Sequence, residues 1–204
     1  MIAMRIHHMV IKTAAVAASA LLILSLSGCV TGSGPRNFVR ADANISTIQK
    51  IAVLPFESFV SNDEYAGEKI RRVVMTELLM NGFEVMEPGE VSKELVVIKK
   101  ALQVLTVDDL KKIAKTLGVD ALMMGSVETY KISTGLTVPY PDVSINMRLF
   151  DAASGNVSWS IVHTSGGPGI GSRHFGTEGP SLGDAAHRVV RESVDALISS
   201  RRGS

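Results

Sequence analysis

Hydrophobic and polar positions alternate along the chain with two periods, those of strands and of helices. Residues 51–56 (IAVLPF) form a short apolar run, which is typical of a strand buried on both faces. Apolar residues then recur at helical spacing over 66–80, and the charged residues within 68–72 lie off that stripe, so we expect them on a solvated helix face. Residues 83–86 predict a second strand, parallel to the first.

Two further helices follow in the pattern. Apolar residues with a 4, 3, 4 spacing predict a helix over 91–102. Thr106 and Asp109 then have the spacing of a capping box, and Gly118 suits the left-handed position after a helix. The sequence therefore predicts a third helix between Thr106 and Gly118.

Three strands are predicted next. Residues 121–132 open with a buried run, whereas 143–149 and 157–161 alternate apolar and polar side chains. The five residues 151–155 are of hairpin length, so the last two strands should be antiparallel neighbours. Residues 133–142 predict only a short loop between the first two of these strands.

The last quarter of the chain divides into a loop and a helix. Residues 165–183 contain seven glycines and two prolines, which predicts a long exposed loop. A wide apolar stripe then predicts a helix that starts near Ser181 and runs to Ile198. The element order β-α-β-α-α-β-β-β-α predicts an α+β domain over residues 50–200, a single mixed sheet with helices packed on it.

The N-terminus has the layout of a secretory signal. Arg5 and Lys12 precede an apolar run over 14–24, which is shorter than the roughly 20 residues that span a bilayer. The tetrapeptide 26–29 (LSGC) resembles a bacterial lipobox, which implies removal of residues 1–28 and acylation of Cys29 with fatty acids such as palmitate. An ordinary signal peptide cleaved near residue 28, with a chance cysteine, is the alternative.

Cleavage before Cys29 leaves 176 of the 204 residues, enough for one domain with a real core. The mature chain carries 19 Lys and Arg against 20 Asp and Glu, so its charge gives no reason to expect nucleic acid as a partner. Residues 29–49 read as a flexible tether. In lipobox proteins the residue after the lipidated cysteine influences which membrane the protein is sorted to. Val30 in this position implies the periplasmic face of the outer membrane.

The residues of the predicted domain resemble a known family. The stretches are IAVLPF at 51–56, LGVDALMMGSV at 117–127 and RLFD at 148–151, the last followed by Gly155 and Trp159. They resemble the CsgG-type bacterial envelope lipoproteins, a group that includes the curli secretion channel and the LpoB activator of peptidoglycan synthases. The resemblance covers about residues 50–161 and implies a fold more than an activity.

Two departures limit what the resemblance implies. Curli-type channels insert long membrane-crossing hairpins into this domain, and the short connections of this sequence hold none, so channel activity does not carry over. LpoB-like activators use a long disordered arm to reach their synthase, whereas residues 29–49 are short. A subunit of a CsgG-like secretion complex remains an alternative function.

Catalytic motifs are absent from the sequence. It has no HExxH, no GxSxG and no second cysteine, and the glycine cluster at 166–171 ends in Ser172-Arg173 where a P-loop needs Lys followed by Ser or Thr. His163, His174 and His187, with Asp184, could form a metal or acid-base site, but their spacing matches no ligand motif. We therefore expect no enzyme, no cofactor and no metal, with a periplasmic metal-dependent enzyme as an alternative.

These observations favour a non-enzymatic outer-membrane lipoprotein that binds envelope proteins during assembly or export, with homo-oligomers expected. The acylated Cys29 would bind membrane lipid. In the glycine-rich loop, Arg and aromatic side chains are of the types that anchor interfaces. The sequence therefore predicts a partner-binding site at Ile170, Arg173, His174 and Phe175. A loop without a binding role is the alternative.

Overall fold

A computed structural model describes residues 35–134, 139–166 and 179–202 of the chain. Its strands are β1 (Asn37–Val39), β2 (Lys50–Val53), β3 (Glu57–Ser58), β4 (Glu84–Val85), β5 (Ala121–Thr134), β6 (Pro139–Asp151) and β7 (Val157–Gly166). Its helices are α2 (Ala66–Met80), α3 (Pro88–Ile98), α4 (Val107–Leu117) and α6 (Leu182–Arg202), with 3-10 turns η1 (Ile45–Thr47) and η2 (Leu102–Val104).

The strands form one mixed sheet in the order β1-β7-β6-β5-β2-β4, and β3 pairs with β5 beyond the end of β2. Strand β2 runs parallel to β4 and β5, whereas β5, β6, β7 and β1 are successively antiparallel. The predicted α+β class, the parallel second strand and the antiparallel last pair are confirmed.

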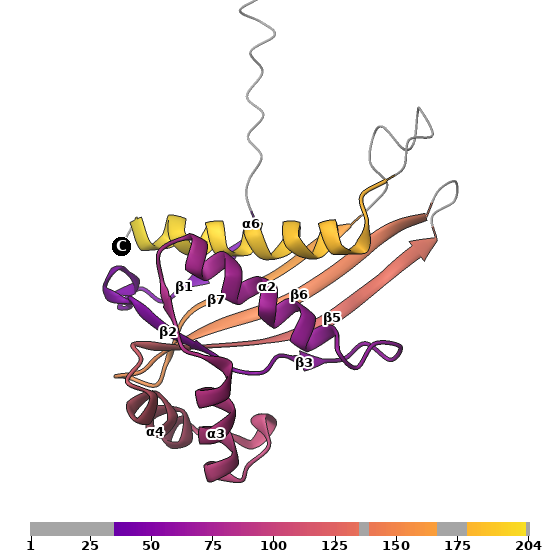
Figure 1. The fold of residues 1–204 in the computed structure, drawn as a ribbon. Coiled ribbons are helices and arrows are strands. Elements are labelled where there is room, and N and C mark those ends of the chain that lie inside the picture. The colour runs from indigo at the N-terminus through magenta and orange to yellow at the C-terminus, as the bar shows by residue number, and fades with distance from the viewer. Residues whose placement is uncertain (1–34, 135–138, 167–178, 203–204) are drawn as a thin grey trace, which may run out of the picture. The chain divides into compact units, whose positions relative to one another are not determined.

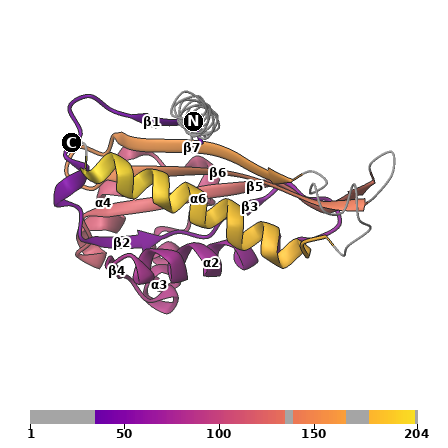
Figure 2. The ribbon, with the colours of Figure 1, turned by 90° about the horizontal axis from the view of Figure 1, so that it is seen from above.

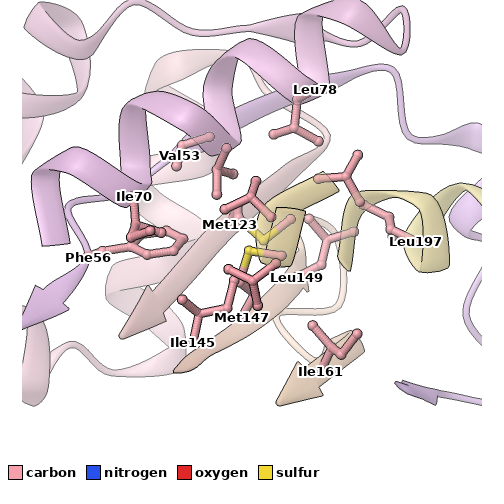
Figure 3. Close-up of a cluster of buried hydrophobic side chains, with 14 of the residues drawn as sticks. Val53, Phe56, Ile70, Leu78, Met123, Ile145, Met147, Leu149, Ile161 and Leu197 are labelled. Atoms are coloured by element: carbon pink, nitrogen blue, oxygen red, sulfur yellow. The ribbon is translucent and has the colours of Figure 1, made fainter. Parts of the chain in front are cut away.

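One face of the sheet is covered along most of its length by α2 and α6, and Figure 1 shows both helices above the strands. Seen from above in Figure 2, α6 runs across the sheet with α2 beside it. Inward residues of alternating strands and the apolar stripes of both helices form the larger core (Figure 3). Trp159 belongs to this core and is fully buried.

Among the residues that the structure describes, helices cover the opposite face only at one end. Helices α3 and α4 pack there against β2 and the start of β5 (Figure 1). A smaller core lies between them and includes Leu54, Ile113 and Leu122. The sheet is therefore buried on both faces where β2 lies, as the apolar run predicted, and on one face elsewhere.

Local capping explains where two of the helices begin. The Thr106 hydroxyl accepts a hydrogen bond from the Asp109 backbone N–H, and the Asp109 carboxylate accepts from the Thr106 N–H, so the predicted capping box is confirmed. Ser181 and Asp184 make the same reciprocal pair before α6. Gly118 ends α4 with a φ of 61°, as predicted.

A buried arginine fastens α2 to the sheet. Arg71 is only 4% exposed, and its Nε and Nη2 atoms both donate to the Val53 carbonyl, at 3.0 and 2.8 Å. Pro55 lies two residues beyond Val53 and has no N–H to offer a ladder. The prediction that the charged residues within 68–72 face solvent is therefore wrong at Arg71, because its guanidinium satisfies the last carbonyl of β2.

Two other close approaches set the position of β5. The Asp120 carboxylate accepts from the backbone N–H groups of Gln49 and Lys50, at 2.9 and 2.8 Å, at the point where β2 begins. At Gly125 a Cβ atom would lie 2.4 Å from the Phe56 ring, so only glycine leaves room for that ring. Asp120 and Gly125 both belong to the LGVDALMMGSV stretch, and both have structural roles.

The fold begins earlier than the sequence predicts. Residues 37–39 form β1 against β7, and Ile45 and Ile48 are buried in the larger core. The tether assignment of residues 29–49 is therefore wrong from residue 37 onward. Residues 37–49 show no hydrophobic period in the sequence, because a three-residue edge strand and single buried isoleucines are too short to produce one.

Two further boundaries need correction. Residues 133–142 are not a loop at their ends, because Thr134 pairs with Pro139 and Lys131 with Asp142 in a continued β5–β6 ladder. Helix α3 ends at Ile98, where Lys99 takes a left-handed conformation with a φ of 54°, so the predicted extension to residue 102 is wrong. Leu102 fits the helical spacing although it lies outside the helix, because η2 places it against the smaller core.

Candidate functional site

The residues that the sequence singled out most strongly lie outside the described part of the chain. They are the predicted lipidation site Cys29 and the predicted partner-binding residues Ile170, Arg173, His174 and Phe175. Both assignments stay predictions.

The candidate acid-base residues that are described have separate structural surroundings. His163 on β7 lies 2.6 Å from the Glu192 carboxylate on α6, measured from Nε2 to Oε2. Asp184 caps α6 through Ser181, and these hydrogen bonds lower the pKa of its carboxyl group. His187 is exposed on α6. The structure thus gives Asp184 a capping role and pairs His163 with a different carboxylate from the one predicted.

Within residues 35–134, 139–166 and 179–202, no three His, Cys, Asp or Glu side chains are placed to hold a metal ion. None of the helices in those ranges has the length and apolar character needed to cross a membrane.

Within the described residues, no helix packs on the rest of the second face of the sheet, which we call the open sheet face. It is formed by outward side chains of β5, β6 and β7, beyond the end covered by α3 and α4. The residues that define it are Ser126, Thr129, Ser144, Asn146, Arg148, Ser160, Val162 and Thr164. Each is half-buried or exposed, as expected of a sheet that faces solvent on one side.

The open sheet face is rich in hydroxyl groups. Thr164 donates to the Ser144 hydroxyl at 2.9 Å across β7 and β6. At the centre, Asn146 has a side-chain oxygen that is buried and without a hydrogen-bond partner in the structure. Buried polar atoms are usually satisfied, so the buried Asn146 oxygen is an exception within the sheet. Beside it lies Arg148, an exposed cation.

A cleft opens on the other side of the molecule, where the chain enters the fold. It has a volume of about 630 Å³ and lies between the start of β1 and the last half of α6. Pro35 and Asn37 line it on one side and Glu192 and Asp195 on the other. Asn37 closes one end by donating from Nδ2 to the Ser200 hydroxyl at 2.8 Å. The lining of the cleft mixes polar and apolar surface, and Glu192 is already paired with His163.

The sequence carried a signal for the open sheet face. Residues 143–149 alternate apolar with Ser144, Asn146 and Arg148, a pattern that predicts one solvated side. The composition of residues 165–183 instead favoured the glycine-rich segment as the contact region. The open sheet face was not predicted as a site, because the sequence of one strand does not show which of its sides a helix covers.

No protein-family model matches the sequence, and neither does any curated protein. Solved structures do match its fold. The PelC dodecamer from Paraburkholderia phytofirmans has a TM-score of 0.54 at 18% identity, covering 79% of this chain and 94% of that one. A single-substitution variant of that PelC gives a TM-score of 0.54 at 20% identity, covering 79% and 96%.

Lipoprotein GNA1162 from Neisseria meningitidis has a TM-score of 0.51 at 18% identity, covering 76% of this chain and 99% of that one. At this level of identity the likenesses show the fold alone. The chain therefore has a fold that is also found in a bacterial lipoprotein and in PelC. The finer resemblance to CsgG-type proteins stays a prediction.

Proposed function

We propose that this protein is a lipid-anchored envelope protein that binds other proteins and assembles with copies of itself, without catalysing a reaction. Cys29 would carry the lipid and hold the domain at the periplasmic face of the outer membrane. The observation that supports this most is the fold shared with lipoprotein GNA1162 and with PelC, whose solved structures are dodecamers. The open sheet face supplies surface for such contacts.

The early start of the fold brings the domain close to its proposed anchor. With β1 beginning at Asn37, only residues 29–36 separate the acylated cysteine from the sheet. Fully extended, these residues reach at most about 30 Å. The domain would then meet its partners close to the membrane surface.

The glycine-rich segment is retained as a proposed contact region for such partners. Its residues Ile170, Arg173, His174 and Phe175 combine an apolar, a cationic and an aromatic side chain within six positions. Replacing Arg173 and Phe175 together by alanine should reduce in-cell cross-links to partner proteins. Undiminished cross-linking in this double variant would assign the contacts to another surface.

Two measurements test the proposed function. Cells labelled with a radioactive fatty acid should incorporate label into the wild type and not into Cys29→Ser, which should leave the membrane fraction or remain uncleaved. Wild-type protein extracted in mild detergent should sediment as a homo-oligomer. Absence of label would refute the lipid anchor, and a monomer at all concentrations would refute self-assembly.

A further inference from the structure

The chain enters the described fold along one edge of the sheet. Strand β1 is the last strand at this edge, and within the described residues it pairs only with β7. Figure 2 shows β1 at the margin of the sheet, beside β7. Pro35 is the first described residue, and β1 begins two residues later. The β1 edge is therefore the part of the sheet that lies nearest along the chain to the proposed anchor, Cys29.

The β1 edge exposes two neighbouring apolar side chains. Phe38 is 54% exposed and Val39 is 37% exposed. In the register of the sheet, Phe38 lies opposite Ser160, on the side of the open sheet face, and Val39 lies opposite the buried Trp159, on the covered side. Successive side chains of a strand point to opposite faces. The rim of the sheet thus carries one exposed apolar side chain on each of its two sides.

Backbone groups of β1 are exposed along the same rim. Because Arg40 donates its N–H to the Ser158 carbonyl, the alternate residues Asn37 and Val39 turn their backbone groups outward. Outward N–H and C=O groups need water or another polar partner. The headgroup region of a membrane offers such partners, whereas the hydrocarbon region does not. The rim therefore suits the boundary between headgroups and lipid chains.

Charged groups near the rim are mixed in sign. Arg36 is exposed, and Arg40 pairs with Asp42 at 3.7 Å between Nε and Oδ1. Glu192 and Asp195 line the cleft at the start of β1. These described groups have no net positive charge that would attract anionic lipid. Any attraction to a lipid surface would come from the apolar side chains.

The length of chain before the sheet indicates what meets this rim. Residues 29–36 reach at most about 30 Å from the proposed lipid to the start of β1. Neighbouring strands lie about 4.8 Å apart, so the opposite edge of the sheet, at β4, is about 24 Å beyond β1. Phe59, which is 62% exposed, follows β3 on the far side of β5 and is also farther along the sheet. The point of attachment thus favours the β1 edge for contact with lipid.

We propose that the β1 edge rests on the lipid surface in which Cys29 is anchored, with Phe38 and Val39 in the headgroup region. The inference rests on the proposed lipid anchor. Only an edge-on approach brings side chains from both faces of the sheet to one surface, so the sheet stands upright on the membrane. Arg148 lies two strands inward of Phe38 on the open sheet face, and it stays outside the lipid. The open sheet face is then accessible to partners.

Fluorescence quenching in vesicles tests the contact. Full-length lipidated protein carries a nitrobenzoxadiazole label on Phe38→Cys, Phe59→Cys or Arg148→Cys, in three separate variants, while the acylated Cys29 does not react. Phosphatidylcholine vesicles carry a spin label on their acyl chains, close to the headgroups. The label at position 38 should lose at least about half of its fluorescence, and the labels at positions 59 and 148 less than about a tenth.

The two comparison positions distinguish other orientations. Quenching at position 148 equal to that at position 38 would show that the sheet lies flat on the membrane. Equal quenching at position 59 would show that the domain has no preferred orientation. Either result would overturn the inference.

A matched pair of serine variants tests the role of Phe38 itself, with the label on Arg36→Cys. Phe38→Ser should reduce quenching at position 36 at least about twofold, because the apolar contact is lost. Phe59→Ser removes a phenylalanine of similar exposure and should change it by less than about a tenth. Equal effects of the two variants would contradict a contact made by Phe38.

Lipid composition tests the source of the attraction. Replacing about a third of the phosphatidylcholine by phosphatidylglycerol should leave quenching at position 38 unchanged, because the rim has no net positive charge. Quenching that appears only with phosphatidylglycerol would contradict an apolar contact.

Flotation of the same vesicles separates this inference from the proposed anchor. If unlabelled wild type floats with the vesicles while positions 36 and 38 are not quenched, the anchor stands and the edge contact is wrong. If the wild type does not float, the anchor is refuted, and the inference with it. Loss of quenching at position 38 as the ratio of protein to lipid rises would show that a second copy covers the edge, which would also overturn the inference.

Discussion

The two faces of the central sheet differ in what covers them, although the same strands form both. On β6, Val143, Ile145, Met147 and Leu149 are fully buried beneath α6, whereas the intervening Ser144, Asn146 and Arg148 lie on the open sheet face. Burial of apolar area supplies most folding free energy, so the covered face holds the fold together. The open face buries less apolar area and therefore contributes less to stability.

The largest expected difference comes from neighbouring residues of β6. Ile145→Ala should lower the free energy of unfolding by about 2–5 kcal/mol, because it leaves a cavity in the larger core. Ser144→Ala should change it by less than about 0.5 kcal/mol. Urea unfolding followed by circular dichroism measures both. Similar losses for the two variants would contradict the assignment of the faces.

A second prediction concerns the attachment of α2 to the covered face. Arg71→Met keeps much of the side-chain volume but leaves the Val53 carbonyl without its two guanidinium donors. A buried carbonyl left unpaired costs about 1–3 kcal/mol, so the midpoint of urea unfolding should fall accordingly. Arg72→Met, on the exposed side of the same helix, is the matched control and should be nearly silent. An unchanged midpoint in Arg71→Met would show that this bond contributes nothing.

The helices on the two faces begin with the same type of cap, and this allows a smaller comparison. Thr106→Ala at α4 and Ser181→Ala at α6 should each cost about 1 kcal/mol. Hydrogen exchange should rise in the first turn of the affected helix only. If Thr106→Ala also increased exchange at the start of α6, the two faces would not be independent.

Acid should weaken these two caps only at low pH. Hydrogen bonds from Lys100 and then Thr106 lower the pKa of Asp109 from 3.8 to about 2, and those from Ser181 lower the pKa of Asp184. A carboxyl group with a lowered folded-state pKa stabilises the fold above its ordinary pKa and loses that contribution as the pH falls. Unfolding free energy should thus decline between about pH 4 and pH 2. Asp109→Asn should reduce the slope in this window, and an unchanged slope would refute the contribution of Asp109.

Patterns with a regular period predicted most of the fold. Alternation predicted β6 and β7, helical spacing predicted α4 and α6, and a capping box predicted the start of α4. The missed elements are short or irregular: β1 and β3 have three and two residues, too few for a period to be visible. Prolines 139 and 141 suggested a loop, but proline is compatible with an edge strand. The pairing of these strand segments depends on tertiary contacts, which a local sequence pattern does not contain.

The candidate surfaces could be predicted only in part. Polar positions on β6 indicated a solvated side, but the open sheet face arises from where α3 and α4 stop, which is a tertiary property. The burial of Arg71 was likewise hidden, since its position on the helix resembles that of the exposed Arg72. Residues 170–175, which composition favoured as a contact region, remain a prediction.

The most direct test of the account compares the two faces in intact cells. A photo-reactive amino acid is placed at Val162, which is 63% exposed on the open sheet face, and separately at Arg188, which is exposed on α6 above the covered face. The account predicts protein adducts from position 162 and few from position 188. Adducts that form mainly from position 188 would contradict it and assign partner binding to the helical side.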